Sequence, residues 1–182
     1  MARELGELLG LEHELRLGLQ RGEFTLHYQP EVNLDDGEIV GVEALLRWNS
    51  PRRGVVPPDR FIPVAEATGL ILPLGEFVLR EACLQTARWR DEGVLPENFV
   101  TWVNLSGRQL AGSGIGSVVR SALTNADLPP RCLGLEITET ALVHEGAGWK
   151  RGQADLQALH EDGVRIAIDD FGTGFSSLGQ LR

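Results

Sequence analysis

Cysteine and basic charge are both scarce in this sequence of 182 residues. The two cysteines, Cys83 and Cys132, lie in apolar runs and are too few for a disulfide scaffold, so we expect reduced thiols and a cytoplasmic location. Basic residues are outnumbered, since 17 Lys and Arg against 26 Asp and Glu give a formal net charge of −9. That charge disfavours non-specific binding of nucleic acid or of anionic lipid.

Long hydrophobic runs are absent as well. A membrane-spanning helix needs about 18 consecutive apolar residues, whereas the richest stretch, Leu70 to Leu74, is interrupted by Pro73. Residues 1–20 mix leucines with Arg and Glu, which is unlike a signal peptide. We therefore expect no membrane span. What is present is a globular composition, with 42% hydrophobic and 24% charged residues, in a chain long enough to bury a core.

The first 48 residues are predicted to form a helix followed by a β-hairpin. Leucines at near-helical spacing predict an N-terminal helix or linker over residues 1–22, ended by Gly22. Residues 24–32 and 38–48 are rich in β-forming side chains, and the Asp36-Gly37 pair lies between them. Because Asp-Gly favours a tight turn, these segments predict an antiparallel hairpin, the start of a domain over residues 23–182.

Beyond a loop at residues 51–58, helices and strands alternate. We expect helices over residues 61–67, 74–91, 108–126 and 152–161, strands over 98–105, 132–138 and 164–169, and a new helix near residue 177. This order predicts an α/β fold with a mostly parallel sheet covered by helices. A closed eight-stranded barrel takes about 250 residues. The five expected strands therefore form either an open sheet or the first part of a barrel.

Oxygen-bearing side chains recur on one face of successive expected strands. Side chains alternate across a strand, so each strand has an aliphatic face and a face with a carboxylate or an amide near its C-terminal end. The members of this set are Glu43, Asn104, Glu136 and Asp169, with Asp170 beside the last. Burying an isolated acidic group costs several kcal/mol, so a shared cation explains the set economically.

The donor types narrow the choice of metal. Oxygen ligands suit Mg²⁺ or Mn²⁺, whereas the four histidines and the cysteines have no spacing typical of a zinc site. Each carboxylate taken alone is more readily a helix cap or the partner of a surface arginine, and it is the shared face that favours a metal. Glu139 lies past its strand and is as readily a first-turn helix residue.

A set of motifs in one order resembles the EAL domains, bacterial phosphodiesterases of the second messenger cyclic di-GMP. They are Tyr28-Gln29-Pro30, Glu43-Ala44-Leu45-Leu46-Arg47-Trp48, Phe61-Ile62-Pro63 with Ala65-Glu66 and Gly69-Leu70-Ile71, Val103-Asn104-Leu105-Ser106, Leu135-Glu136-Ile137-Thr138-Glu139-Thr140, and Ile168-Asp169-Asp170-Phe171-Gly172-Thr173-Gly174. The resemblance runs from about residue 24 to the last residue and implies a TIM-like (β/α) barrel whose first strand is antiparallel to the others.

The resemblance also implies roles for individual residues. Glu43, Asn104, Glu136 and Asp169 would bind a first Mg²⁺ or Mn²⁺ ion and Asp170 a second, with Glu43, Asp169 and Asp170 central to catalysis. Gln29 and Arg47 would contact the dinucleotide, Arg47 through a phosphate, because a guanidinium fork suits that group. Glu139 would support the loop over residues 170–177. One departure is Phe175, where the family usually has Tyr.

The resemblance stops short of the family's last three strands. Those strands carry a catalytic Lys, a metal-binding Glu and a substrate-side Gln, and the sequence to Arg182 contains none of them. We therefore expect an incomplete EAL domain with only the first five strands. Alone, it should hydrolyse cyclic di-GMP undetectably or several orders of magnitude more slowly than a complete domain. Two alternatives stay open, a non-catalytic receptor of cyclic di-GMP and an inactive fragment. By analogy, a homodimer and an upstream sensor or cyclase domain are also expected.

Overall fold

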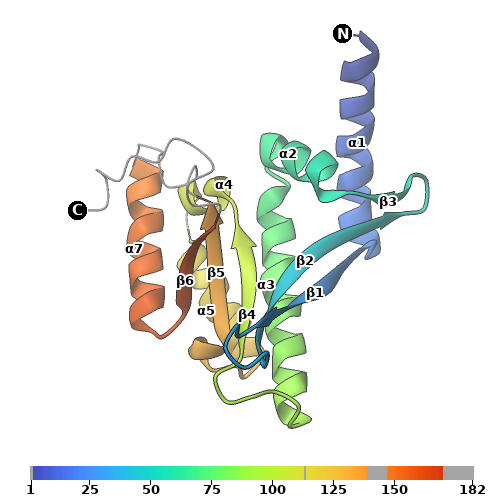
Figure 1. Ribbon diagram of the computed structural model, residues 1–182. Coiled ribbons are helices and arrows are strands. Elements are labelled where there is room, and N and C mark those ends of the chain that lie inside the picture. The colour runs from blue at the N-terminus through green and yellow to red at the C-terminus, as the bar shows by residue number, and fades with distance from the viewer. Residues whose placement is uncertain (1, 113, 139–146, 170–182) are drawn as a thin grey trace.

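The computed structural model describes residues 2–112, 114–138 and 147–169 (Figure 1). Its strands form one sheet in the order β1-β2-β4-β5-β6, with β3 paired to β2. The strands are β1 (Phe24–Val32), β2 (Ile39–Ser50), β3 (Gly54–Val56), β4 (Val100–Leu105), β5 (Leu133–Thr138) and β6 (Arg165–Asp169). The helices are α1 (Ala2–Arg21), α2 (Pro58–Thr68), α3 (Ile71–Asp91), α4 (Gly107–Ala111), α5 (Ile115–Asn125) and α7 (Ala147–Glu161), and a 3-10 turn covers Pro130–Cys132.

The topology confirms the predicted hairpin and parallel sheet. β1 and β2 are antiparallel, and Gln29 lies opposite Glu43. The pairs β2–β4, β4–β5 and β5–β6 are all parallel. The chain therefore has the antiparallel first strand that the resemblance to EAL domains implies, with the parallel strands beside it in one sheet (Figure 1).

Two apolar clusters hold the layers together. In the larger one, the aliphatic face of β4 and β5 packs against α3, α5 and α7, so that Leu135 and Leu79 are completely buried. In the smaller one, α1 and α2 cover the hairpin, with Leu15 packed beside Trp48 and Phe61. The Trp48 indole also donates a hydrogen bond to Glu23 Oε2 at 3.0 Å. Both clusters leave the opposite face of the sheet open for polar side chains.

The structure corrects two parts of the predicted pattern. Residues 54–56, expected in a loop, form the short strand β3 against the end of β2, so the described sheet has a sixth strand. The helix expected over residues 108–126 is two helices, because Gly112 is extended and Gly114 adopts a left-handed conformation with φ of 100°. Closely spaced glycines weaken a helix at this point. The helix expected near residue 177 lies outside the described residues.

Candidate active site on the open face of the sheet

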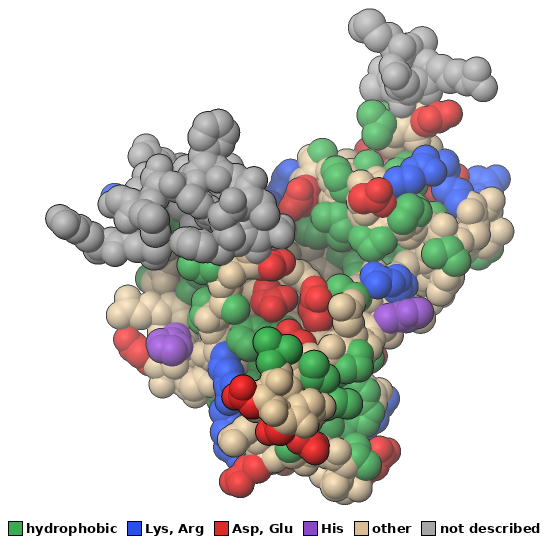
Figure 2. All heavy atoms as spheres, in the orientation of Figure 1, with side chains coloured by type: hydrophobic (Ala, Val, Ile, Leu, Met, Phe, Trp, Pro, Cys, Tyr) green, Lys and Arg blue, Asp and Glu red, His purple; other side chains and the backbone are tan. Residues whose placement is uncertain are grey.

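The predicted ligands Glu43, Asn104, Glu136 and Asp169 share the open face of neighbouring strands. Asn104 is paired with Glu136 across β4 and β5, and Asp169 is paired with Thr138 across β5 and β6. Between β2 and β4, Asn104 Nδ2 donates a hydrogen bond of 2.6 Å to Glu43 Oε1. Figure 2 shows acidic side chains gathered in the middle of this face. Asp170 and Glu139, the other acidic residues predicted here, lie outside the described residues.

The carboxylates of this face repel one another. Burial, together with the negative charges of Glu43, Asp169 and Glu31, raises the pKa of Glu136 to about 7. Like charges that are partly removed from water favour protonation of one member. A bound cation would relieve the same repulsion, so the charge and the all-oxygen donor set fit a hard divalent metal.

The ligands are gathered but do not form a finished metal shell. Within residues 2–112, 114–138 and 147–169, no three His, Cys, Asp or Glu side chains are grouped closely enough to hold a metal ion together. Asn104 is an amide, and it presents its NH₂ group to Glu43. An amide binds a metal through its oxygen, so metal binding at this site requires the Asn104 amide to rotate.

Glu31 is a further acidic residue of the site that sequence reasoning missed. It lies on β1 opposite Gly41, and its carboxylate and the Trp102 indole nitrogen both lie close to this glycine. Burial and the nearby Glu43 carboxylate raise the pKa of Glu31. A β-carbon at Gly134 would overlap the Trp102 ring, so this glycine makes the room for the indole. The alternation of side chains along β1 could have identified it, because Glu31 follows Gln29 by two residues and therefore lies on the same face.

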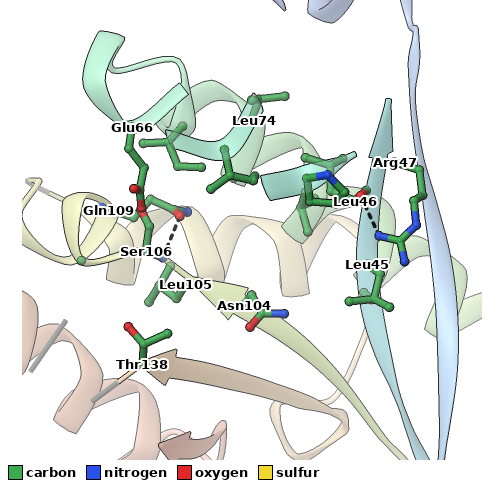
Figure 3. Close-up of a pocket in the computed structure, with 17 residues that line it drawn as sticks. Leu45, Leu46, Arg47, Glu66, Leu74, Asn104, Leu105, Ser106, Gln109 and Thr138 are labelled. Atoms are coloured by element: carbon green, nitrogen blue, oxygen red, sulfur yellow. Dashed lines mark hydrogen bonds between the residues drawn. The ribbon is translucent and has the colours of Figure 1, made fainter. Parts of the chain in front are cut away.

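The two predicted substrate-binding residues lie on the hairpin. Gln29 is exposed on β1 beside Glu43. Arg47 is half-buried on β2, and its guanidinium donates a hydrogen bond of 3.0 Å to the Leu46 carbonyl (Figure 3). In the described part of the chain, Arg47 forms no ion pair with a carboxylate. Its remaining donors can therefore bind an anionic ligand such as a phosphate.

A cavity of about 330 Å³ opens beside the Glu43–Asn104 pair. It lies between the C-terminal ends of β2 and β4 and the helices α2, α3 and α4 (Figure 3). Its walls are largely aliphatic, from Leu45, Ile62 and their neighbours, with a few polar groups at one side. Figure 3 shows Glu66 reaching from α2 toward Ser106 on the opposite wall. An apolar cavity with a few convergent polar groups is typical of a small-molecule site.

These features together can support one kind of chemistry. A cluster of oxygen ligands suits a divalent metal, and the half-buried Arg47 can bind a phosphate at the same edge of the sheet. A metal beside a bound phosphate is the arrangement used for metal-assisted hydrolysis of phosphate esters. The formal net charge of −9 disfavours broad electrostatic attraction for nucleic acid.

Proteins of known family are similar to this chain in sequence and in fold. The sequence pattern of the EAL domain matches residues 12–182. The chain is 46% identical over 176 residues to the bifunctional diguanylate cyclase/cyclic di-GMP phosphodiesterase MucR of Pseudomonas aeruginosa, a match that covers 97% of this chain and 25% of MucR. It is 38% identical over 181 residues to the cyclic di-GMP phosphodiesterase PdeR of Escherichia coli K12, which covers 100% of this chain and 26% of PdeR.

Solved structures agree with these matches. The MucR phosphodiesterase of Pseudomonas aeruginosa, solved in complex with c-di-GMP, superposes with a TM-score of 0.84 at 45% identity, covering 92% of this chain and 66% of that one. The EAL enzyme Bd1971, in its cAMP- and cyclic-di-GMP-bound form, gives a TM-score of 0.86 at 34% identity. The match covers 97% of this chain and 47% of Bd1971. The chain thus spans about a quarter of MucR and PdeR. Among the described helices, none is long and apolar enough to cross a membrane.

Proposed function

Because the chain belongs to the EAL domain family, we propose that it supplies the first-metal half of a phosphodiesterase that hydrolyses cyclic di-GMP to the linear dinucleotide pGpG. The observation that carries this proposal is the Glu43–Asn104 hydrogen bond on the same face as Glu136 and Asp169, beside the cavity. The relatives MucR and PdeR are both named as cyclic di-GMP phosphodiesterases, which supports the choice of substrate.

In this proposal the residues divide into ligands and substrate contacts. Glu43, Asn104, Glu136 and Asp169 hold one Mg²⁺ or Mn²⁺ ion, and Asp170 contributes to a second. Two such ions supply activation of water and stabilisation of negative charge on the phosphate when they are bound. Asn104 turns its amide oxygen inward, which releases its hydrogen bond to Glu43.

The substrate contacts come from the hairpin. Arg47 binds a phosphate of the dinucleotide through its remaining guanidinium N–H donors. Its hydrogen bond to the Leu46 carbonyl orients the planar guanidinium group. Gln29, which lies opposite the proposed metal ligand Glu43 on the neighbouring strand, contacts the same dinucleotide. For Glu139, which lies outside the described residues, we propose the supporting role that the family resemblance implies.

We also propose further domains, an oligomeric state and a cellular location for this chain. The chain spans about a quarter of MucR, whose name includes a diguanylate cyclase, so an upstream cyclase or sensor domain is part of the proposal. A homodimer is proposed on family analogy alone. A cytoplasmic location is proposed because Cys83 and Cys132 are both free and buried.

The test compares hydrolysis of cyclic di-GMP by two forms of the protein. One is the 182-residue chain, and the other is the same chain completed with the three remaining strands of the family barrel. Each is incubated with cyclic di-GMP and Mn²⁺, and the products are separated by chromatography. We expect pGpG from the completed form and a rate several orders of magnitude lower from the shorter chain, because groups that activate the water are absent from it.

The matched control is Glu136→Ala in the completed form. We expect it to lose both Mn²⁺ binding, measured by calorimetry, and hydrolysis. If Glu136→Ala hydrolyses cyclic di-GMP at the unsubstituted rate, the ligand assignment is wrong. If the completed form binds cyclic di-GMP in Mn²⁺ and leaves it intact, the receptor function replaces the enzymatic one.

A further inference from the structure

The short helix α4 follows β4 directly and contacts α2, α3 and α7. We propose that α4 is a clamp that positions Asn104 against Glu43, and that Gln109 is its central positioning residue. The positioning itself is a property of the fold, whereas its consequence for metal binding rests on the proposed function. Four observations carry the proposal. The first concerns the sheet, and the other three concern contacts of α4.

The first observation is that the sheet ladder does not fix Asn104 against β2. The parallel pairing of β2 with β4 runs from Gly41–Val100 to Ala44–Val103. Asn104 therefore lies one residue beyond the last pair on that side, although it still pairs with Glu136 on β5. The hydrogen bond of 2.6 Å to Glu43 thus depends on how the end of β4 is held.

The second observation is a reciprocal cap between β4 and α4. The Ser106 hydroxyl accepts a hydrogen bond from the Gln109 backbone N–H at 3.3 Å. In return, the Ser106 backbone N–H donates to Gln109 Oε1 at 3.0 Å. Such a capping box fixes the direction in which a chain enters a helix. Because Ser106 comes two residues after Asn104, the cap holds the end of β4 in place.

The third observation is that α3 holds the Gln109 side chain in one position. Gln109 is only 7% exposed. Its side-chain amide lies against Gly75, where a β-carbon would overlap Gln109 Nε2. A larger residue at position 75 would push the amide away from Ser106. Gly75 therefore lets the amide approach the α3 backbone and form the cap.

The fourth observation ties α4 to the end of α2. Arg108 Nη1 donates hydrogen bonds to the carbonyl groups of Glu66 and Ala67, the latter at 3.1 Å. These carbonyls belong to the last turn of α2, where the Glu66 carbonyl also accepts a hydrogen bond from the Gly69 N–H at the C-cap. One helical turn thus joins α2, α3 and β4 along one wall of the cavity (Figure 3).

The test follows the Asn104 side-chain NH₂ resonances by ¹H–¹⁵N NMR in the metal-free chain, with Asn104→Asp identifying the signals. Gln109→Leu removes the cap, whereas Gln109→Glu keeps it, because Glu serves equally at this position of a capping box. We expect the Asn104 signals to shift and broaden in Gln109→Leu and to stay near their original positions in Gln109→Glu. Gln157→Leu, at an exposed site on α7, is the matched control and should leave them unchanged.

Calorimetry with Mn²⁺ alone gives the second readout. We expect affinity to fall about tenfold in Gln109→Leu and to be largely retained in Gln109→Glu. The cap holds the end of β4, and from that position the Asn104 amide can turn its oxygen from Glu43 to the metal. Tenfold is the scale of loss seen when residues that orient metal ligands are removed. If Gln109→Leu does not fold, Ser106→Ala, which removes one of the two capping bonds, is measured in its place and should move the Asn104 signals in the same direction.

The outcomes separate this inference from the proposed function. Unmoved Asn104 signals in a folded Gln109→Leu chain with a lowered melting temperature would show that α4 only stabilises the fold, and the inference would be overturned. Asn104 signals that move as expected, in a chain that binds no Mn²⁺ in any form, would support the clamp and contradict the metal-dependent function.

Discussion

The two faces of the sheet are made by the same strands and have opposite properties. On the covered face, Leu133, Leu135 and Ile137 of β5 are buried among helices. On the open face, burial and the neighbouring carboxylates together raise the pKa of Glu136 to about 7. The covered face stabilises the fold by removing apolar surface from water. The open face gathers like charges that oppose folding until a cation neutralises them, which is typical of a site selected for function.

The largest effect is expected on the covered face. Leu135→Ala should lower the free energy of unfolding by about 3 kcal/mol, because Leu135 is 0% exposed and its truncation leaves a cavity. Urea denaturation followed by circular dichroism measures the change. The matched control is Leu34→Ala, where the side chain is 94% exposed and the loss should be below about 0.5 kcal/mol. Equal losses at both positions would contradict the assignment of the covered face.

The next effect concerns the room that the open face gives to Trp102. Gly134→Ala places a β-carbon where the Trp102 ring lies, so we expect a loss of stability of about 1–3 kcal/mol from overpacking. Thermal melting compares it with Gly6→Ala, a helical position with nothing within 4 Å of the added carbon. The control should stabilise the chain by up to about 1 kcal/mol. A stabilising Gly134→Ala would show that Trp102 is not held over this glycine.

Glu136→Gln should stabilise the metal-free chain and make its stability less dependent on pH. Because the native pKa of Glu136 is raised to about 7, the folded state binds the proton more tightly than the unfolded state does. Its stability contribution therefore falls as pH rises from about 4.5 to 7. Allowing for partial exposure, the substitution should gain about 1–2 kcal/mol at pH 8 and almost nothing at pH 4.

The measurement for Glu136→Gln is urea denaturation at both pH values, with the exposed Glu97→Gln as the control. Adding Mn²⁺ sharpens the comparison of the two faces. The metal should stabilise the unsubstituted chain and have little effect on Glu136→Gln, because only a native-state ligand set gains stability from binding. A gain from Glu136→Gln that is the same at pH 4 and pH 8 would exclude carboxylate repulsion as its cause.

The smallest effect on the fold is expected at Arg47. Arg47→Lys keeps the charge and loses the planar fork, so stability and Mn²⁺ affinity should hold while affinity for cyclic di-GMP falls roughly tenfold. Calorimetry in Mn²⁺ measures both affinities. The exposed Arg90→Lys on α3 serves as the control. Unchanged affinity for cyclic di-GMP in Arg47→Lys would remove Arg47 from the phosphate contact.

Much of the site was predictable because strand periodicity is local. Alternation placed Glu43, Asn104, Glu136 and Asp169 on one face, and the topology confirms that their strands are neighbours. The same rule reaches Glu31, which was missed because it lies outside the motifs. No periodicity predicts the three residues of β3, since their pairing partners are on β2. The split of residues 108–126 into α4 and α5 likewise depends on the conformations of Gly112 and Gly114.

The sequence by itself determined the order of elements, the antiparallel hairpin and the oxygen-donor character of the open face, because these follow from alternation, turn residues and side-chain chemistry. The tertiary structure alone decided that Trp102 meets Glu31 and that Gln109 meets Gly75. It also decided that Asn104 faces Glu43 from beyond the β2–β4 ladder. These contacts join residues far apart in the chain, and close packing between elements, which no local pattern encodes, sets their geometry.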